Sequence, residues 1–83
     1  MAEIAVTEIK SEGSGFEYEV VVTEGGSQTS HRVKLKKEYY LELTEGRATP
    51  DELVGKSFEF LLENEPKESI LGSFDLSVIA RYF

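Results

Sequence analysis

The stretch FEYEVVVTEGGSQTSHRVKL, residues 16–35, decides the fold of this chain. Apolar and polar residues alternate on both sides of a Gly-Gly pair, a pattern typical of two antiparallel strands joined by a two-residue turn. With Gly25 and Gly26 at the centre of the turn, Tyr18 lies opposite Val33 and shares a face with it. The stretch therefore predicts a hairpin with one apolar face.

The same register gives the hairpin a charged second face. It places Glu19 opposite Arg32 and Glu17 opposite Lys34. Oppositely charged residues that face each other across two strands attract. We therefore expect two cross-strand ion pairs, which would neutralise part of the most basic segment of the chain.

The residues before the hairpin predict a third strand over residues 3–10, with Val6 opposite Val20. Ile9 has the opposite parity from Val6, which indicates a β-bulge. Residues 11–15, Ser-Glu-Gly-Ser-Gly, predict a five-residue turn between the two strands. The N-terminal part is therefore expected to form an antiparallel meander with one face to be covered.

Helical signals dominate the rest of the chain. A short helix is predicted over residues 37–45, with Gly46 after its end. Thr49-Pro50-Asp51-Glu52 is typical of a helix start, with Thr49 as N-cap, and predicts a helix over residues 50–63. Gly55, inside that helix, indicates that another element approaches it closely.

Proline and the apolar pattern define the last part. Pro66 ends the second helix and is expected to open a single turn. Either Ser73 or Asp75 can cap a last helix, whose apolar residues are Leu76, Val78, Ile79, Tyr82 and Phe83. The fold class is therefore α+β: one domain, residues 1–83, with a three-stranded antiparallel β-meander (1–36) and about three short α-helices (37–83) packed on one sheet face.

Composition limits the chemistry. The 83 residues include no cysteine and one histidine, and the net charge is −7. Without cysteine there is no disulfide or thiolate nucleophile, which suits a reducing compartment. The early residues resemble no secretory leader and no run is long enough to span a membrane, so we expect a cytoplasmic protein.

Catalytic and metal-binding residues are not expected. The hairpin register turns His31 toward the apolar face, where a histidine is more often packed and hydrogen-bonded than reactive. The acidic residues fall on faces predicted to be exposed, where they are solvated. We therefore predict no enzyme activity, no cofactor, no metal site and no small-molecule substrate.

The basic residues are concentrated in residues 32–47, where five cations stand against three acids. They are Arg32, Lys34, Lys36, Lys37 and Arg47. In outline, a basic strand followed by two helices over residues 29–64 resembles the ribbon-helix-helix family of DNA-binding dimers. The resemblance implies a DNA-binding regulator or antitoxin in which these five residues contact the nucleic acid.

A second resemblance covers the C-terminal part, Phe58 to Phe83. It includes LLENEPKESIL, residues 61–71, and SFDLSVI, residues 73–79. This part is similar to small hypothetical prokaryotic proteins of no assigned activity. The resemblance implies a compact bacterial or archaeal domain and no particular chemistry.

The first function hypothesis is a protein–protein interaction module, self-associating for example as a homodimer, without membrane or nucleic-acid partners. Its candidate interface is aromatic and apolar: Tyr39, Tyr40, Ile79, Tyr82 and Phe83. Whether the C-terminal aromatic residues belong to the core or the interface stays open. The regulator ranks second because Glu17 and Glu19 would neutralise its cations. The third hypothesis is an acidic inhibitor that mimics nucleic acid.

Overall fold

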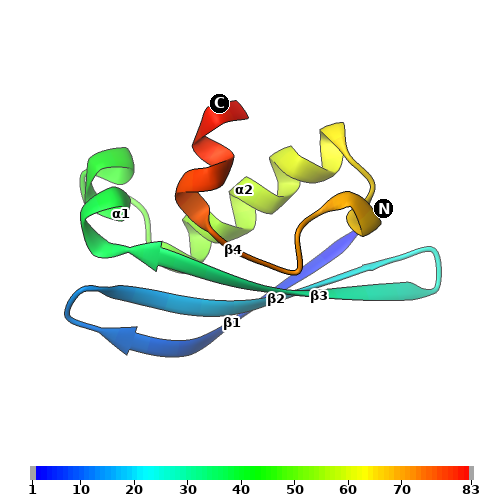
Figure 1. The fold of residues 1–83 in the computed structure, drawn as a ribbon, viewed down its shortest axis with the longest axis horizontal. Coiled ribbons are helices and arrows are strands. Elements are labelled where there is room, and N and C mark those ends of the chain that lie inside the picture. The colour runs from blue at the N-terminus through cyan, green and yellow to red at the C-terminus, as the bar shows by residue number, and fades with distance from the viewer. Residues whose placement is uncertain (1, 83) are drawn as a thin grey trace.

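The computed structural model describes residues 2–82, and their side chains as far as Ile79. Three long strands follow one another, β1 (Glu3–Glu12), β2 (Gly15–Glu24) and β3 (Ser27–Lys36). A short fourth strand, β4 (Ser73–Asp75), completes a sheet with the order β1-β2-β3-β4. Figure 1 shows this sheet as the lower layer, with the helices above it.

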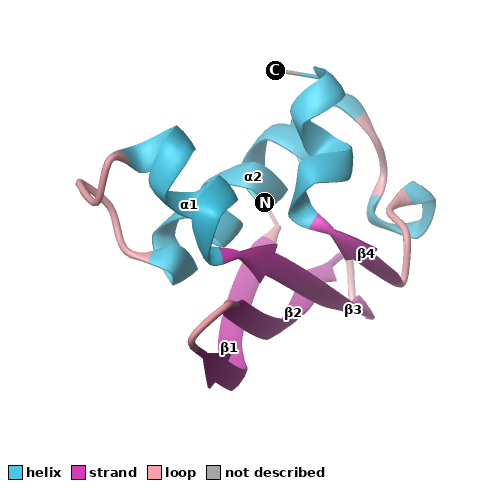
Figure 2. Cartoon of the chain, turned by 60° about the vertical axis from the view of Figure 1, so that its left-hand side comes forward, coloured by secondary structure: helices cyan, strands magenta, loops and turns pink. Residues whose placement is uncertain are grey.

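The helical layer is formed by two α-helices and two 3-10 helices. The α-helices are α1 (Lys37–Thr44) and α2 (Pro50–Asn64). The 3-10 helices are η1 (Lys67–Ser69) and η2 (Leu76–Tyr82). They cover one face of the sheet and leave the other uncovered (Figure 2). No helix within residues 2–82 has the length and apolar character needed to cross a membrane.

The predicted hairpin register is confirmed. Tyr18 pairs with Val33, and Glu24 with Ser27 at the turn. Gly25 and Gly26 have φ angles of 63° and 82°, as both central residues of a type I′ turn require. Glycine adopts this left-handed region without steric cost.

The bulge at Ile9 is also confirmed, because the β1–β2 register shifts between Glu8 and Lys10. Beyond the shift the strands continue to pair, as far as Glu12 with Gly15. The expected five-residue turn is therefore wrong. After the bulge, residues 10–12 of β1 pair with residues 15–17 of β2, so only residues 13 and 14 remain in the turn.

Two features of the predicted architecture need correction. β4 lies parallel to β3, with Val33 opposite Phe74, so the sheet has four strands and is mixed. The last helix, η2, is a 3-10 helix, which leaves two α-helices instead of about three. Asp75 nevertheless caps η2 as expected, since its Oδ1 accepts a hydrogen bond from Ser77 N at 3.0 Å.

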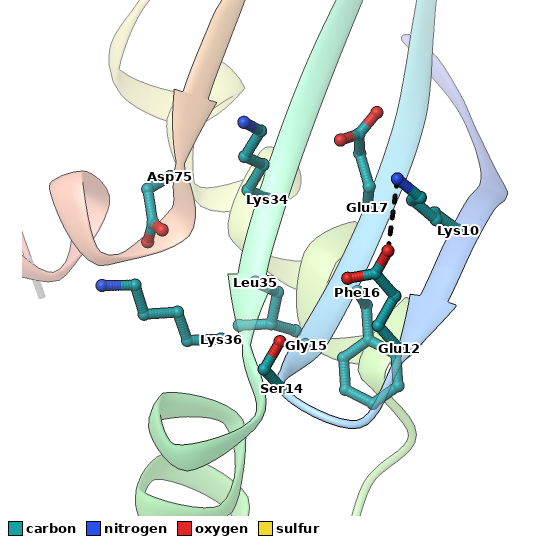
Figure 3. A pocket seen from close by; sticks show the side chains of 10 residues that line it. All are labelled: Lys10, Glu12, Ser14, Gly15, Phe16, Glu17, Lys34, Leu35, Lys36 and Asp75. Atoms are coloured by element: carbon teal, nitrogen blue, oxygen red, sulfur yellow. Dashed lines mark ion pairs between the residues drawn. The ribbon is translucent and has the colours of Figure 1, made fainter.

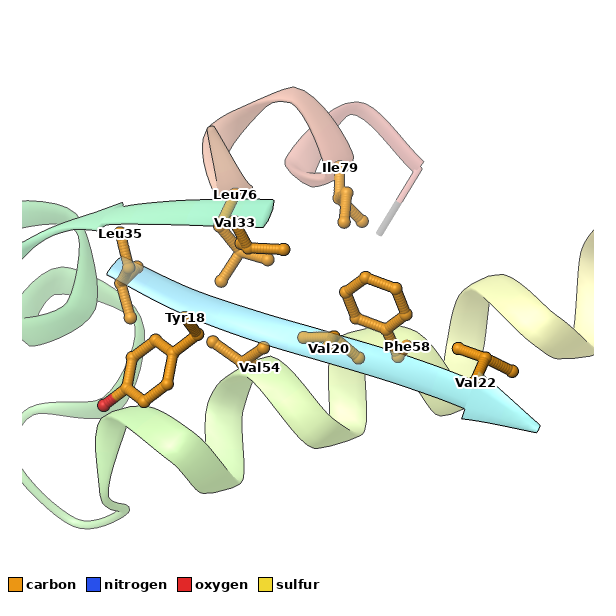
Figure 4. Close-up of a cluster of buried hydrophobic side chains, with 9 residues drawn as sticks. All are labelled: Tyr18, Val20, Val22, Val33, Leu35, Val54, Phe58, Leu76 and Ile79. Atoms are coloured by element: carbon orange, nitrogen blue, oxygen red, sulfur yellow. The ribbon is translucent and has the colours of Figure 1, made fainter. Parts of the chain in front are cut away.

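The core lies between the sheet and the helices (Figure 4). Its buried apolar side chains come from β2, β3, α2 and η2: Tyr18, Val20, Val22, Val33, Leu35, Val54, Phe58, Leu76 and Ile79. The Thr49 hydroxyl accepts a hydrogen bond from Glu52 N at 3.3 Å, so the predicted N-cap of α2 is confirmed. This cap fixes the start of the helix that carries Val54 and Phe58 into the core.

α1 packs less tightly, and none of its residues is buried. The chain enters the left-handed region at Glu45, where φ is 54°, one residue before the predicted Gly46. Leu41 and Leu43 remain 44% and 45% exposed. α1 therefore presents apolar surface to the solvent.

Candidate functional site

An apolar groove with a volume of about 480 Å³ lies at the C-terminal end of α2. We call it the α2–η2 groove. Seven of its ten lining residues are apolar, among them Phe60, Ile70, Leu71, Phe74 and Val78. Its polar lining residues are Asn64, Glu65 and Ser69. Such a hollow suits an apolar side chain or ligand better than a charged one.

The groove arises where the chain turns back after α2. The chain leaves the helical conformation at Glu65, and η1 and Ile70 lead it to β4. Leu71 and Val78, on opposite sides of β4 in the sequence, stay 59% and 40% exposed. The sequence predicted a turn here but gave no signal for a groove, because its walls meet only in the folded chain.

His31 holds one wall of this groove in place. Its Nδ1 lies 2.8 Å from the carbonyl oxygen of Leu71 and its Nε2 lies 2.7 Å from Thr29 Oγ1. A carbonyl can only accept, so Nδ1 carries a proton and donates it to Leu71. The ring also packs on Phe58, with 5.4 Å between centroids. The packed role predicted for His31 is confirmed, with two polar partners instead of one.

Below the groove, aromatic rings connect three elements. Phe58 of α2 lies between His31 of β3 and Phe74 of β4, with 5.9 Å between the Phe58 and Phe74 centroids. Aromatic pairs at such distances add stability beyond the area they bury. Phe74, which also lines the groove, is therefore packed against the core, whereas Leu71 and Val78 of the lining are exposed.

The aromatic residues predicted for the interface occupy different environments. Tyr40 packs edge-on against Phe16 and donates a hydrogen bond from its hydroxyl to the carbonyl of Ala48. Ile79 is 3% exposed and belongs to the core. The Tyr82 side chain and Phe83 lie outside the described part of the chain. Of the five residues, the three whose side chains are described do not form one exposed patch, because Ile79 is buried.

Tyr39 has a buried hydroxyl oxygen that contacts no hydrogen-bond partner among the described residues. Burial, followed by the negative charges of Glu42 and Asp75, raises the pKa of this phenol. A buried hydroxyl without a partner costs free energy. It adds no chemistry to the α2–η2 groove, because Tyr39 belongs to α1 and does not line that groove.

Three of the predicted basic residues, Arg32, Lys34 and Lys36, lie along the uncovered face of the sheet. Lys37 begins α1, and Arg47 lies in the loop between α1 and α2. Lys34 and Lys36, together with Lys10, line a second hollow of about 280 Å³ (Figure 3). Three acids line the same hollow: Glu12, Glu17 and Asp75. The hollow therefore has mixed charge. Within it, Lys10 Nζ lies 3.2 Å from Glu12 Oε1.

The ion pairs of this face differ from the expected ones. Arg32 reaches diagonally to Glu17, at 3.5 Å, and does not pair with Glu19 directly opposite. A long side chain can reach the diagonal neighbour on the next strand. Arg47 pairs with Glu45 at 3.6 Å, whereas Lys34, Lys36 and Lys37 form no ion pair with any described residue.

A buried lysine is a feature that the sequence did not reveal. The side chain of Lys67 is only 6% exposed, and its ammonium bonds the carboxylate of Glu68. This contact lowers the pKa of Glu68. No group of three potential metal ligands occurs within the described residues.

Comparison of the chain with protein-family models, curated proteins and solved structures finds no match. The resemblance of residues 29–64 to ribbon-helix-helix proteins therefore stays a prediction. The same holds for the similarity of residues 58–83 to hypothetical prokaryotic proteins.

Proposed function

We propose that this protein is a non-catalytic protein-interaction module of the cytoplasm, and that the α2–η2 groove is its docking site. One observation carries the proposal: an apolar groove of about 480 Å³ leaves Leu71 and Val78 exposed on a highly charged domain. Contiguous exposed apolar surface on a small domain marks an interaction site more often than chance. A side chain of a partner protein would be buried there.

The chemistry of the remaining residues supports a binding role. The single histidine already has partners on both ring nitrogens and is 3% exposed. A general base must reach the proton that it removes. His31 is instead engaged in holding the groove wall.

Photo-crosslinking in the cells that make the protein tests this proposal. A photoreactive residue at Leu71 should give adducts with protein, identified by mass spectrometry. The matched control is Ile9, an apolar residue that is 43% exposed on β1. Equal adducts at both positions, or none at Leu71, would show that the groove is not a docking site.

DNA binding is the second candidate, favoured by the exposed row of Arg32, Lys34 and Lys36 along β3. Affinity for DNA requires several cations that are free to contact phosphates. Arg32 is paired with Glu17, and the neighbouring hollow holds three acids, so we expect only non-specific binding. Fluorescence anisotropy should give a dissociation constant no tighter than about 10⁻⁴ M at physiological salt. Sequence-selective nanomolar binding would place the regulator first.

The acidic-inhibitor hypothesis would use the exposed carboxylates of α2. It predicts that the chain binds a basic protein, and that this binding persists when the apolar side chains of the groove are removed. The crosslinking experiment separates the two modes, because an acidic mimic needs no contact at Leu71.

A further inference from the structure

We propose that β1 pairs edge to edge with β1 of a second copy of this chain, antiparallel and with a two-fold axis at Ala5. Residues 3–7 are called the β1 edge. The contact would join the two four-stranded sheets into one continuous sheet. It uses none of the residues that line the α2–η2 groove, so it is tested independently of the docking site.

The outer side of β1 carries backbone groups without partners. β1 is the first strand in the sheet order, at the edge away from β4 (Figure 2). Lys37 N donates to Ser14 O at 3.0 Å and continues the β2–β3 register, so even-numbered residues of β2 bond to β3 and odd-numbered ones to β1. Before the bulge, odd-numbered residues of β1 face odd-numbered residues of β2. The peptide groups of Ile4, Val6 and Glu8 therefore point outward, and none of them bonds to another residue within 2–82.

The sequence of β1 confines pairing to its first half. Folded proteins block open strand edges with bulges, prolines or lysines, because an open edge accepts a strand of another chain. The second half of β1 has two of these features, the bulge at Ile9 and the side chain of Lys10. The β1 edge, Glu-Ile-Ala-Val-Thr, has none of them.

The β1 edge is complementary to itself. Antiparallel pairing about Ala5 places Ile4 opposite Val6 of the other copy, and the two-fold axis produces this pair twice. Both side chains are half-buried and pack against the core, so the pairs extend the apolar face of the sheet. Pairs of β-branched residues across two strands stabilise a sheet. On the other face Ala5 meets Ala5 and Glu3 meets Thr7, so no like charges face each other.

The neighbouring symmetric registers fit less well. Pairing about Val6 would place the Glu8 carboxylate opposite Ile4, on the apolar face. Pairing about Ile4 would leave the outward peptide group of Glu8 without a partner. The register about Ala5 also puts the smallest side chain at a non-hydrogen-bonded pair, where Cα atoms are only about 4.5 Å apart. A second copy is therefore the strand that this edge itself specifies.

Cysteine crosslinking of the full chain locates the axis. The sequence contains no cysteine, so Ala5→Cys introduces a single thiol. At the axis the two Cα atoms would lie about 4.5 Å apart, a distance that a disulfide spans. Thr7→Cys is the matched control, exposed on the same strand and face, and its two copies would lie about 13 Å apart or more, four residues along the strand. Under mild oxidation Ala5→Cys should dimerise about tenfold faster or more. Equal rates would overturn the proposal.

Charge variants test the same axis without a covalent bond. Sedimentation equilibrium of the wild type should show a reversible dimer in the micromolar range. Ala5→Lys and Ala5→Glu should each raise the dissociation constant by about tenfold or more, because two like charges meet at the axis. Their equimolar mixture should regain association, since a lysine then faces a glutamate. Circular dichroism verifies that the variants, which alter an exposed side chain, are folded.

The matched controls are Ser30→Lys and Ser30→Glu. Ser30 is exposed on the same sheet face, opposite Val21, which in turn faces Ala5. These variants change the net charge by the same amount away from the β1 edge and should associate like the wild type. Equal losses at Ser30 and Ala5 would contradict the contact. A wild type that is monomeric at high micromolar concentration would also exclude it, as would a mixture no more associated than either variant alone.

The salt dependence gives an independent check. Each copy carries a net charge of −7, so two copies repel each other and salt screens this repulsion. Association through the β1 edge should therefore strengthen between about 0.1 M and about 1 M salt, where the Debye length falls from about 10 Å to about 3 Å. A dimer that dissociates as salt rises would be held by ion pairs, and the β1 edge would not be its interface.

Discussion

Replacing Gly55 by alanine should stabilise the protein. Gly55 lies within α2, where glycine costs about 0.8–1 kcal/mol relative to alanine. A Cβ at this position would meet only Val6 Cγ2, at 3.8 Å, which is an ordinary van der Waals distance. The predicted close approach is thus a contact with β1 that leaves room for a methyl group. We expect the free energy of unfolding to rise by about 1 kcal/mol.

Thermal and urea unfolding followed by circular dichroism measure this change. For a domain of this size, 1 kcal/mol corresponds to about 4–8 °C in the midpoint. Gly15→Ala is the control, because its Cβ would lie 2.7 Å from the carbonyl oxygen of Leu35 and 3.2 Å from Lys36 Cα. Both are backbone atoms, so this variant should be destabilised. A lower midpoint for Gly55→Ala would refute the spacing between α2 and β1.

Three further predictions concern single side chains. Thr49→Ala removes the N-cap bond to Glu52 and should lower the free energy of unfolding by about 0.5–2 kcal/mol in urea titrations; an unchanged midpoint would argue against the cap. Burial, followed by Glu8, raises the pKa of Tyr18 from 10.0 to about 12. The neutral Tyr18 phenol therefore contributes its full stability to the folded state below pH 10, and this contribution is lost as the pH rises toward 12. Tyr18→Phe should weaken the fall of the thermal midpoint with rising pH, measured in melting curves at a series of alkaline pH values. Tyr39→Phe removes a buried hydroxyl without a partner and should leave the thermal midpoint equal or higher, whereas a large drop would reveal a hydrogen bond.

The candidate site was predicted only in part. Alternation correctly placed His31 on the inner face of the hairpin, but its partner Leu71 is 40 residues away in the sequence. The aromatic and apolar composition of the C-terminal part predicted an interface that includes Ile79, Tyr82 and Phe83. It could not show that Ile79 is buried while Val78 is exposed, because that depends on how η2 lies over β3.

The sequence by itself determined the features in which interacting residues are close along the chain. The hairpin register follows from the alternation around Gly25 and Gly26, and the start of α2 follows from Thr49 and its neighbours. In both, a single turn or cap brings the partners together, so local chemistry decides the geometry.

Only the tertiary structure decided the fourth strand, the diagonal Arg32–Glu17 pair and the α2–η2 groove. β4 has three residues, too few for a periodic signal, and it forms because the edge of β3 offers unpaired groups such as the Arg32 N–H, which donates to Gly72 O at 2.8 Å. The groove likewise requires the end of α2 to meet a segment that returns to the sheet. Contacts of this kind arise from packing between distant segments, which leaves no local pattern in the sequence.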